Sequence, residues 1–236
     1  MKIDVCLVTK NDVQTIPGLE YIPLNNLIIE TSTPLALARK RAIQKVTTSW
    51  FAFIDDDVEI DGSWFKTLAS YTEQPNIGAV QGILCVKGLG KKWDRALNEP
   101  SKKSVCLKLR ERGFTHNTLI RTELVRDWIP PLNLSAWEDY SLTQHILSKG
   151  YQWKTVPTKS NHEKTWRGVW KNAIWSVKGR KNIFPSKLDS LKQILRHTIW
   201  IIRVGLSFNM SWRVKVYRTY LSLAVIYGNT CHLARH

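Results

Sequence analysis

Short apolar runs alternate with helix-like segments along the first part of the chain. The runs 3–8, 26–30 and 49–55 read as short buried strands, and 34–46 reads as an amphipathic helix with Pro34 in its first turn. A strand, a helix and a further strand in succession form the βαβ pattern of parallel sheets. The sequence therefore predicts an α/β fold with a mainly parallel sheet flanked by helices. Ligands of such folds bind beyond the carboxyl ends of the strands.

The alternation continues beyond the third strand. Four more elements are expected: a helix over 62–74 with Ser63 as its cap, a strand over 76–86, a strand within 114–124 and a helix over 136–150. The chain has 236 residues, 43% of them hydrophobic, which suffices for one large domain or for one domain with an appendage.

Positive charge is concentrated in the last third of the chain. The formal net charge is +16, and residues 151–236 hold 16 Lys and Arg against only Glu163 and Asp189. Six of the eleven tryptophans lie there too, at positions 153, 166, 170, 175, 200 and 212. Basic residues interleaved with tryptophan fit an anionic partner with an apolar side, such as a phospholipid surface. A nucleic-acid backbone would attract the same charges.

Targeting and cysteine patterns predict a cytoplasmic setting. The first twenty residues show no secretory signal, and no apolar run approaches the length of a simple membrane-spanning helix. The four cysteines, Cys6, Cys85, Cys106 and Cys231, show no CxxC spacing, so neither a zinc knuckle nor a disulfide framework is expected.

The stretch WFAFIDDDVEIDG (50–62) runs from an apolar strand directly into three aspartates. Adjacent carboxylates repel one another unless a cation or a donor-rich ligand compensates them. Carboxylate oxygens suit Mg²⁺ or Mn²⁺ held partly by substrate phosphates. A solvated turn with an aspartate capping the next helix is the alternative. The strand before the triplet is too apolar to be an exposed edge, which favours a metal-diphosphate site.

Two segments resemble the family 2 glycosyltransferases of GT-A fold, which transfer a sugar from a nucleotide-diphosphate donor. ALARKRAIQKVTTSWFAFIDDDVEIDGSWF (36–65) is similar to the family's Ala-Arg helix, strand and D-x-D motif. WEDYSLTQHILSKGYQW (137–153) is similar to its second signature, and IGAVQGIL (77–84) to a strand between the two. The resemblance covers residues 1–165, which we expect to form the catalytic domain.

The resemblance implies roles for the acidic residues. Asp57 would be the direct metal ligand, and Asp55 and Asp56 would face the ribose and diphosphate, with Asp55 also near the metal. Asp139 would be the general base that deprotonates the acceptor hydroxyl, and Glu138 would support the acceptor or the base. An inverting transfer needs one such carboxylate, and Mn²⁺ or Mg²⁺ to neutralise the leaving diphosphate. Ordinary acidic decoration of a helix's first turn is the alternative for 138–139.

Further residues join the site by the same resemblance. His162 stands where members often complete the metal shell, with a surface histidine as the alternative. Arg39 would contact the nucleotide part of the donor, although a basic helix face would also explain it. Thr9 and Asn11 would line the nucleotide pocket, and Glu30 replaces an aspartate that usually reads the base.

Besides Glu30, three features depart from the family pattern. Lys40 replaces an asparagine after the arginine, and His145 replaces an arginine in the second motif's helix. Segment 11–27 is too short for the usual first crossover helix. The basic stretch 87–113 is either an acceptor-facing loop or a solvated insertion.

Residues 166–236 lie outside the resemblance and predict a basic, Trp-rich helical extension. One helix face is apolar because six residues recur at steps of three or four: Leu188, Leu191, Leu195, Ile199, Ile202 and Leu206. A second helix is expected over 213–228. These helices either pack on the catalytic domain or on each other, or lie in an anionic membrane interface through 186–228.

The sequence as a whole predicts a metal-dependent, inverting glycosyltransferase that uses a nucleotide-sugar donor. The acceptor would be a glycan or a lipid-linked molecule, reached from the cytoplasmic face of the membrane by a peripheral enzyme. A sugar nucleotidyltransferase should show a glycine-rich phosphate loop, and LVTKNDVQ (7–14) has no glycine. A nucleic-acid-binding module would explain the basic third but not the acidic cluster.

Overall fold

The computed structural model describes residues 1–234 except 12, 14, 99–107, 110–112 and 132–133. The elements follow in the order β1 (Ile3–Val8), η1 (Leu19–Tyr21), β2 (Leu24–Glu30), α1 (Leu35–Lys45), β3 (Trp50–Ile54), β4 (Val58–Ile60), α2 (Trp64–Ala69), β5 (Ile77–Lys87), α3 (Lys91–Asn98), β6 (Lys108–Leu109), β7 (Asn117–Arg121), η2 (Thr122–Leu124), α4 (Glu138–Ser148), β8 (Gln152–Glu163), α5 (Trp166–Ile183), α6 (Lys187–Leu206) and α7 (Trp212–Leu233).

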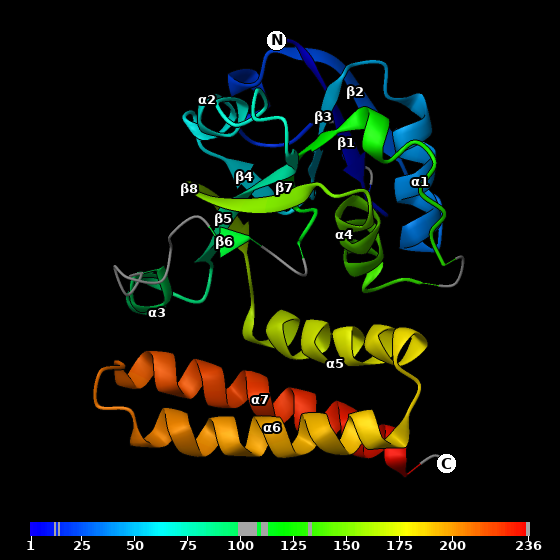
Figure 1. The fold of residues 1–236 in the computed structure, drawn as a ribbon. Coiled ribbons are helices and arrows are strands. Elements are labelled where there is room, and N and C mark those ends of the chain that lie inside the picture. The colour runs from blue at the N-terminus through cyan, green and yellow to red at the C-terminus, as the bar shows by residue number, and fades with distance from the viewer. Residues whose placement is uncertain (12, 14, 99–107, 110–112, 132–133, 235–236) are drawn as a thin grey trace. The chain divides into compact units, whose positions relative to one another are not determined.

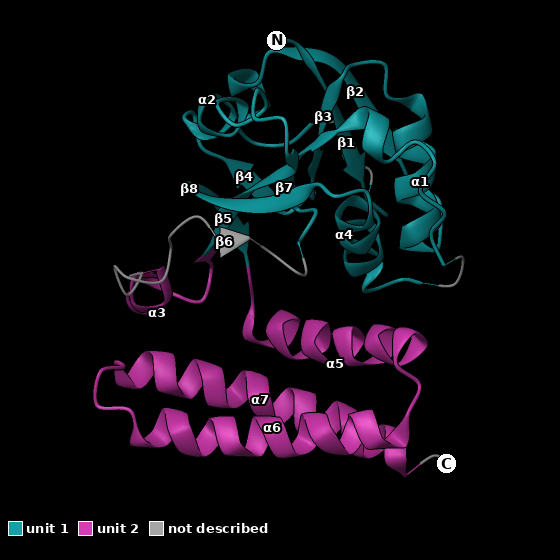
Figure 2. Ribbon diagram, viewed as in Figure 1, with its two compact units in different colours: residues 1–85, 100–163 teal, residues 86–99, 164–236 magenta. Residues whose placement is uncertain are grey.

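The chain divides into two compact units, coloured separately in Figure 2. The N-terminal unit comprises residues 1–85 and 100–163, and the C-terminal unit comprises 86–99 and 164–236. The functional roles expected of 1–165 and 166–236 stay predictions.

One sheet organises the N-terminal unit, with the strand order β2-β1-β3-β7-β5-β8-β4 and β6 beside β8. Strand β1 is parallel to both β2 and β3, whereas β7 is antiparallel to β3 and β5. Strands β4 and β6 are antiparallel to β8. The predicted α/β class with C-terminal helices is confirmed, and its βαβ unit is β2-α1-β3 around the central β1.

Both faces of the sheet are buried, which explains the unbroken apolar run of β3 and the apolar residues that follow Asp4 in β1. Ala52 and Ile54 face one core together with Trp64 of α2, while Phe51 and Phe53 face the other. Helices α1 and α4 cover that second face with Ile43, Leu142 and Ile146, among others. Figure 1 shows α1 and α4 on one side of the sheet and α2 on the other.

Several observed elements differ from the predicted ones. Strands β4 and β8 and helix α3 were not expected from the sequence, and α5 lies in the extension over 166–236 that was predicted to be helical. Helix α2 ends at Ala69 instead of 74, and Ser63 precedes it without a side-chain capping bond because its hydroxyl donates to Asp61. Helix α3 occupies part of the stretch 87–113, where we expected little periodicity, and 99–107 and 110–112 lie outside the described residues.

The C-terminal unit is built from α3, α5, α6 and α7. Tyr220 of α7 donates a hydrogen bond to the Trp166 carbonyl and packs on the Trp170 ring, which joins α7 to α5. His197 of α6 lies 3.2 Å from the Ser222 hydroxyl of α7. Helices α5, α6 and α7 therefore pack on one another, which is one of the two alternatives that the sequence left open. Within the described ranges, no helix has the length and apolar character needed to cross a membrane.

Trp153 is a core residue and not part of a surface aromatic pattern. Its side chain is fully buried in the N-terminal unit, and its indole Nε1 donates to Oε1 of Gln81 at 3.1 Å. Gly113 lies so close that a Cβ added there would sit 2.0 Å from the indole ring. A close approach of backbone to ring therefore requires glycine at this position.

We expect Gly113→Ala to lower the free energy of unfolding by about 1–3 kcal/mol, because the buried ring has no free direction in which to move. Chemical denaturation followed by tryptophan fluorescence measures this change. Gly62→Ala is the matched control, since its new Cβ would meet only Tyr21 at 3.7 Å. Equal stability of the two variants would contradict the packing argument.

Asp4 fastens β1 to the connection between α1 and β3. Its Oδ2 accepts hydrogen bonds from the backbone N–H groups of Thr47 at 2.6 Å and Thr48 at 3.2 Å, and Oδ1 accepts from Asn25. Burial alone would raise the pKa of Asp4, but these donors outweigh it and hold the pKa at about 2.

We expect Asp4→Asn to cost about 2 kcal/mol of stability at neutral pH. Because the folded pKa lies below 3.8, the carboxylate stabilises the fold above that pH, and its contribution is lost as the pH falls through about 2. Denaturation of both proteins at stepped pH values checks this, and their stabilities should converge at the acid end. A constant difference at every pH would contradict it.

Candidate active site

Arg39 joins the two acidic motifs. Its side chain is buried, its Nε lies 3.1 Å from Oε1 of Glu138, and its Nη2 lies 3.4 Å from Oδ1 of Asp55. The guanidinium carbon stands 4.9 Å from the ring centroid of Phe53, which is the last but one residue of β3. One cation therefore holds the end of β3 and the start of α4 together, and the two segments that carried the family resemblance form one site.

The electrostatics of this group are dominated by burial. Burial would lower the pKa of Arg39, but Asp55, Glu138 and Asp139 together raise it. Burial raises the pKa of Glu138, with Arg39 opposing and Asp139 adding to the rise. The pKa of Asp55 is also raised by burial, against the effect of Arg39. Arg39 is thus the charge that makes this concentration of carboxylates tolerable.

Asp56 is held by the end of β1. The Thr9 hydroxyl donates to Oδ2 of Asp56 at 2.5 Å, and the Asn11 amide donates to the same oxygen at 2.7 Å. The Asn11 backbone N–H in turn donates to the Thr9 hydroxyl at 2.9 Å. Two residues predicted to line the nucleotide pocket therefore contact the acid triplet directly.

Asp57 is paired with His162, which lies on β8. Strand β4 is antiparallel to β8 with Val58 opposite His162, so Nε2 of His162 comes to 2.6 Å from Oδ2 of Asp57. His162 is largely buried, and its Nδ1 has no hydrogen-bond partner among the described residues. The alternative of a histidine in a polar surface loop is therefore wrong.

The donor types here fit a divalent ion. Asp57 offers a half-exposed carboxylate and His162 an imidazole nitrogen, both of which suit Mn²⁺. No cluster of three His, Cys, Asp or Glu side chains within the described part of the chain is arranged to hold a metal. An ion at this position would need ligands from a substrate, as Mg²⁺ and Mn²⁺ sites for phosphates often do.

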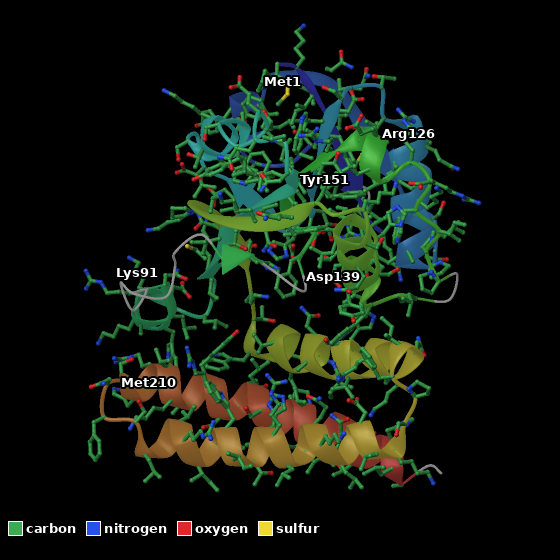
Figure 3. All side chains as sticks on the ribbon, viewed as in Figure 1. Met1, Lys91, Arg126, Asp139, Tyr151 and Met210 are labelled. Atoms are coloured by element: carbon green, nitrogen blue, oxygen red, sulfur yellow. The ribbon has the colours of Figure 1, made fainter. Side chains whose placement is uncertain are left out.

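Helix α4 begins at the second motif. Trp137, before its first residue, has φ 70°, which is the only positive φ of a non-glycine residue in the described chain. Glu138 and Asp139 occupy the first turn and are both buried, and Figure 3 labels Asp139 there. Buried acids are not ordinary surface decoration of a helix. A left-handed tryptophan costs of order 1–3 kcal/mol and marks a constrained turn.

Glu30 at the end of β2 is engaged within the chain. It accepts hydrogen bonds from the Ser32 backbone N–H at 3.1 Å and from the Ser32 hydroxyl, and Lys45 lies 2.9 Å from Oε2. Burial would raise the pKa of Glu30, but these partners lower it to about 2. Its predicted role in reading the base stays a prediction.

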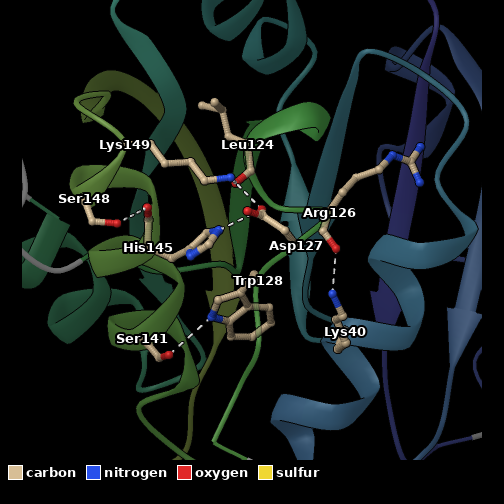
Figure 4. A network of polar contacts seen from close by, with 9 residues as sticks. All are labelled: Lys40, Leu124, Arg126, Asp127, Trp128, Ser141, His145, Ser148 and Lys149. Atoms are coloured by element: carbon tan, nitrogen blue, oxygen red, sulfur yellow. Dashed lines mark hydrogen bonds and ion pairs between the residues drawn. The ribbon is translucent and has the colours of Figure 1, made fainter.

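Two of the departures from the family pattern meet in a separate network, shown in Figure 4. The Lys40 ammonium donates to the Arg126 carbonyl at 2.7 Å. His145 lies 3.1 Å from Oδ1 of Asp127, which Lys149 also contacts at 2.6 Å. Both replacements thus hold the segment after η2 against α1 and α4.

A buried polar group beside the site was not predicted from the sequence. Asn117 lies opposite Ile54, one residue before Asp55, and its amide donates to the Ser160 hydroxyl at 2.6 Å. Its Oδ1, together with Trp64 Nε1 and Thr158 Oγ1, is buried with no hydrogen-bond partner in the described residues. The polar residues THN at the start of the predicted strand FTHNTLIR (114–121) could have indicated this buried polar group.

The family model described as Glycosyl transferase family 2 matches residues 24–129. The matched range contains Glu30, Arg39 and Asp55 to Asp57, and it ends before Glu138. The match confirms the predicted resemblance of this segment to the family 2 glycosyltransferases. A search of curated proteins found no match to the chain.

Similar solved structures include two of S. aureus TarS and one of GalNAc-T7. S. aureus TarS is 14% identical with a TM-score of 0.45, covering 77% of this chain and 40% of its own. Its fragment 1–349 with UDP-GlcNAc is 13% identical with a TM-score of 0.47, covering 100% and 93%. GalNAc-T7 with UDP, GalNAc and Mn²⁺ is 11% identical with a TM-score of 0.49, covering 71% and 44%. These likenesses are too distant to assign substrates to this chain.

We expect Arg39→Gln to lower the free energy of unfolding by about 3–5 kcal/mol, because it leaves two carboxylates without their cation. Urea denaturation measures the change. Arg41→Gln is the matched control on the same helix, since Arg41 is exposed and should change stability by no more than about 0.5 kcal/mol. If both variants lose the same amount, the bridge does not hold the two motifs.

Proposed function

We propose that the protein is a metal-dependent, inverting glycosyltransferase that moves a sugar from a nucleotide-diphosphate donor to an acceptor hydroxyl. The observation that carries the proposal is the Arg39 bridge between Asp55 and Glu138, which joins the aspartate triplet to the buried acids of α4. The family match over 24–129 supports the reaction class.

Asp139 is the proposed general base. It is buried in the first turn of α4, and the backbone N–H of Tyr140 donates to its Oδ1 at 2.8 Å. A donated hydrogen bond and the free N–H groups of a helix start both favour the ionised carboxylate. Asp139 would take the proton of the acceptor hydroxyl as that oxygen attacks the sugar carbon, and Glu138 would hold the acceptor or the base in place.

The donor is proposed to bind at the ends of β1 and β3. Asp55 and Asp56 would face its ribose and diphosphate, beside Thr9 and Asn11, which already hold Asp56. Nη1 of Arg39 is buried and has no hydrogen-bond partner among the described residues. This spare donor supports the predicted contact between Arg39 and the donor, because a buried N–H favours a ligand acceptor.

Asp57 and His162, with Asp55 nearby, would hold Mn²⁺ or Mg²⁺. The ion supplies positive charge that stabilises the departing diphosphate. The acceptor is proposed to be a glycan or a lipid-linked molecule close to the cytoplasmic face of a membrane. That part of the proposal rests on the basic C-terminal residues and not on the site itself.

We expect Asp139→Asn to reduce sugar transfer by at least about a hundredfold, since the amide cannot accept the proton. A screen of nucleotide sugars by thermal shift with Mn²⁺ finds the donor first, and the variant should keep the same shift as the wild type. Asp61→Asn is the matched control, because Asp61 is exposed and its carboxylate accepts hydrogen bonds from the backbone N–H and hydroxyl of Ser63. Full activity of Asp139→Asn would remove the assignment of the base.

A further inference from the structure

The apolar face of α6 is exposed to solvent. Its six members have exposed fractions between 41% and 70%: Leu188, Leu191, Leu195, Ile199, Ile202 and Leu206. Phe208, just after the helix, is fully exposed. Side chains project from α6 on the side turned away from α5 in Figure 3. A continuous apolar row of this length on a protein surface marks an interaction site.

The opposite side of α6 already has its partner. Ser190 and Val204 are buried there, His197 contacts Ser222 of α7, and Arg180 of α5 forms a bidentate ion pair with Asp189 at 2.7 and 2.9 Å. Helix packing within the C-terminal unit therefore uses one side of α6 and leaves the apolar row uncovered.

A basic row runs beside the apolar one. This basic row consists of four exposed residues, each directly after a member of the apolar row: Lys192, Arg196, Trp200 and Arg203. Successive helix residues are about 100° apart, so the two rows are parallel neighbours on the helix surface. An apolar row flanked by cations and a tryptophan is the pattern of a helix lying in the plane of a membrane surface.

The charge decides between possible occupants. A second copy of the chain would bring its own basic row against this one, and two such rows repel. A nucleic acid would pair with the basic row and leave the apolar row in water. An anionic bilayer supplies negative headgroups for the basic row and an acyl-chain region for the apolar row. A helix that is not apolar enough to span the membrane can still lie in its surface plane.

We propose that α6 docks on an anionic phospholipid surface, with the apolar row inserted among the acyl chains and the basic row at the headgroups. The inference concerns the C-terminal unit alone. It goes beyond the proposed sugar transfer and does not depend on it, so that each can fail without the other.

The test is flotation of the full chain with vesicles. Wild-type protein should float with vesicles of equal parts phosphatidylcholine and phosphatidylglycerol and stay below with phosphatidylcholine alone. The double variant Leu195→Gln with Ile202→Gln should lower partitioning by at least about tenfold, because both side chains lose their apolar insertion. Ile129→Gln is the matched control, an isoleucine 83% exposed in the N-terminal unit, and should float as the wild type does.

The second variant pair separates charge from apolar insertion. Arg196→Gln with Arg203→Gln should lower partitioning roughly fivefold for each charge removed. Far-ultraviolet circular dichroism checks that every variant keeps its helices. Three outcomes would overturn the proposal. The variant Leu195→Gln with Ile202→Gln could float as well as the wild type, or the wild type could sediment as a dimer that this variant converts to a monomer. The third is that the protein binds generic duplex DNA but does not bind vesicles.

Discussion

The buried contact of Arg39 with Asp55 and Glu138 is the interaction on which the site depends. Carboxylates placed together at the end of a strand and the start of a helix repel one another, and burial further disfavours their charged forms. A single guanidinium reaches both because its several N–H donors spread across a plane, and the ring of Phe53 supports its face. Asp55 at the end of β3 and Glu138 in the first turn of α4 take their positions around this one cation.

Much of this arrangement could be predicted from the sequence. The apolar run before Asp55 predicted the acidic end of β3, and the family resemblance predicted the acidic start of α4. The match to a known family over 24–129 agrees with the predicted reaction class. What the sequence could not reveal is β8. Its residues alternate apolar and polar only weakly, and KSNHEKTW reads as a polar loop until the antiparallel partner β4 is in place. His162 is buried by that pairing, a long-range contact that no local pattern encodes.

The C-terminal unit illustrates the opposite case. Helix α6 was predicted from periodicity, but periodicity does not say which partner an apolar face has. Some residues of α6 pack against α5 and α7, while its apolar row, the pattern most visible in the sequence, stays exposed. Trp153, grouped with the basic tryptophans by position alone, belongs instead to the core of the other unit. Burial of a tryptophan depends on its strand and neighbours, and nearby charge in the sequence carries no such information.

The pairing of Asp57 with His162 joins residues 105 positions apart, and Arg39 reaches Glu138 across 99. A ribosome therefore releases the three aspartates long before it makes the groups that compensate them. Until β8 has been synthesised, the nascent chain carries these acids without their histidine, and loop closure over such distances is slow. The candidate site is thus among the last parts of the N-terminal unit that can be completed, and a chain truncated before β8 would lack the histidine that pairs with Asp57.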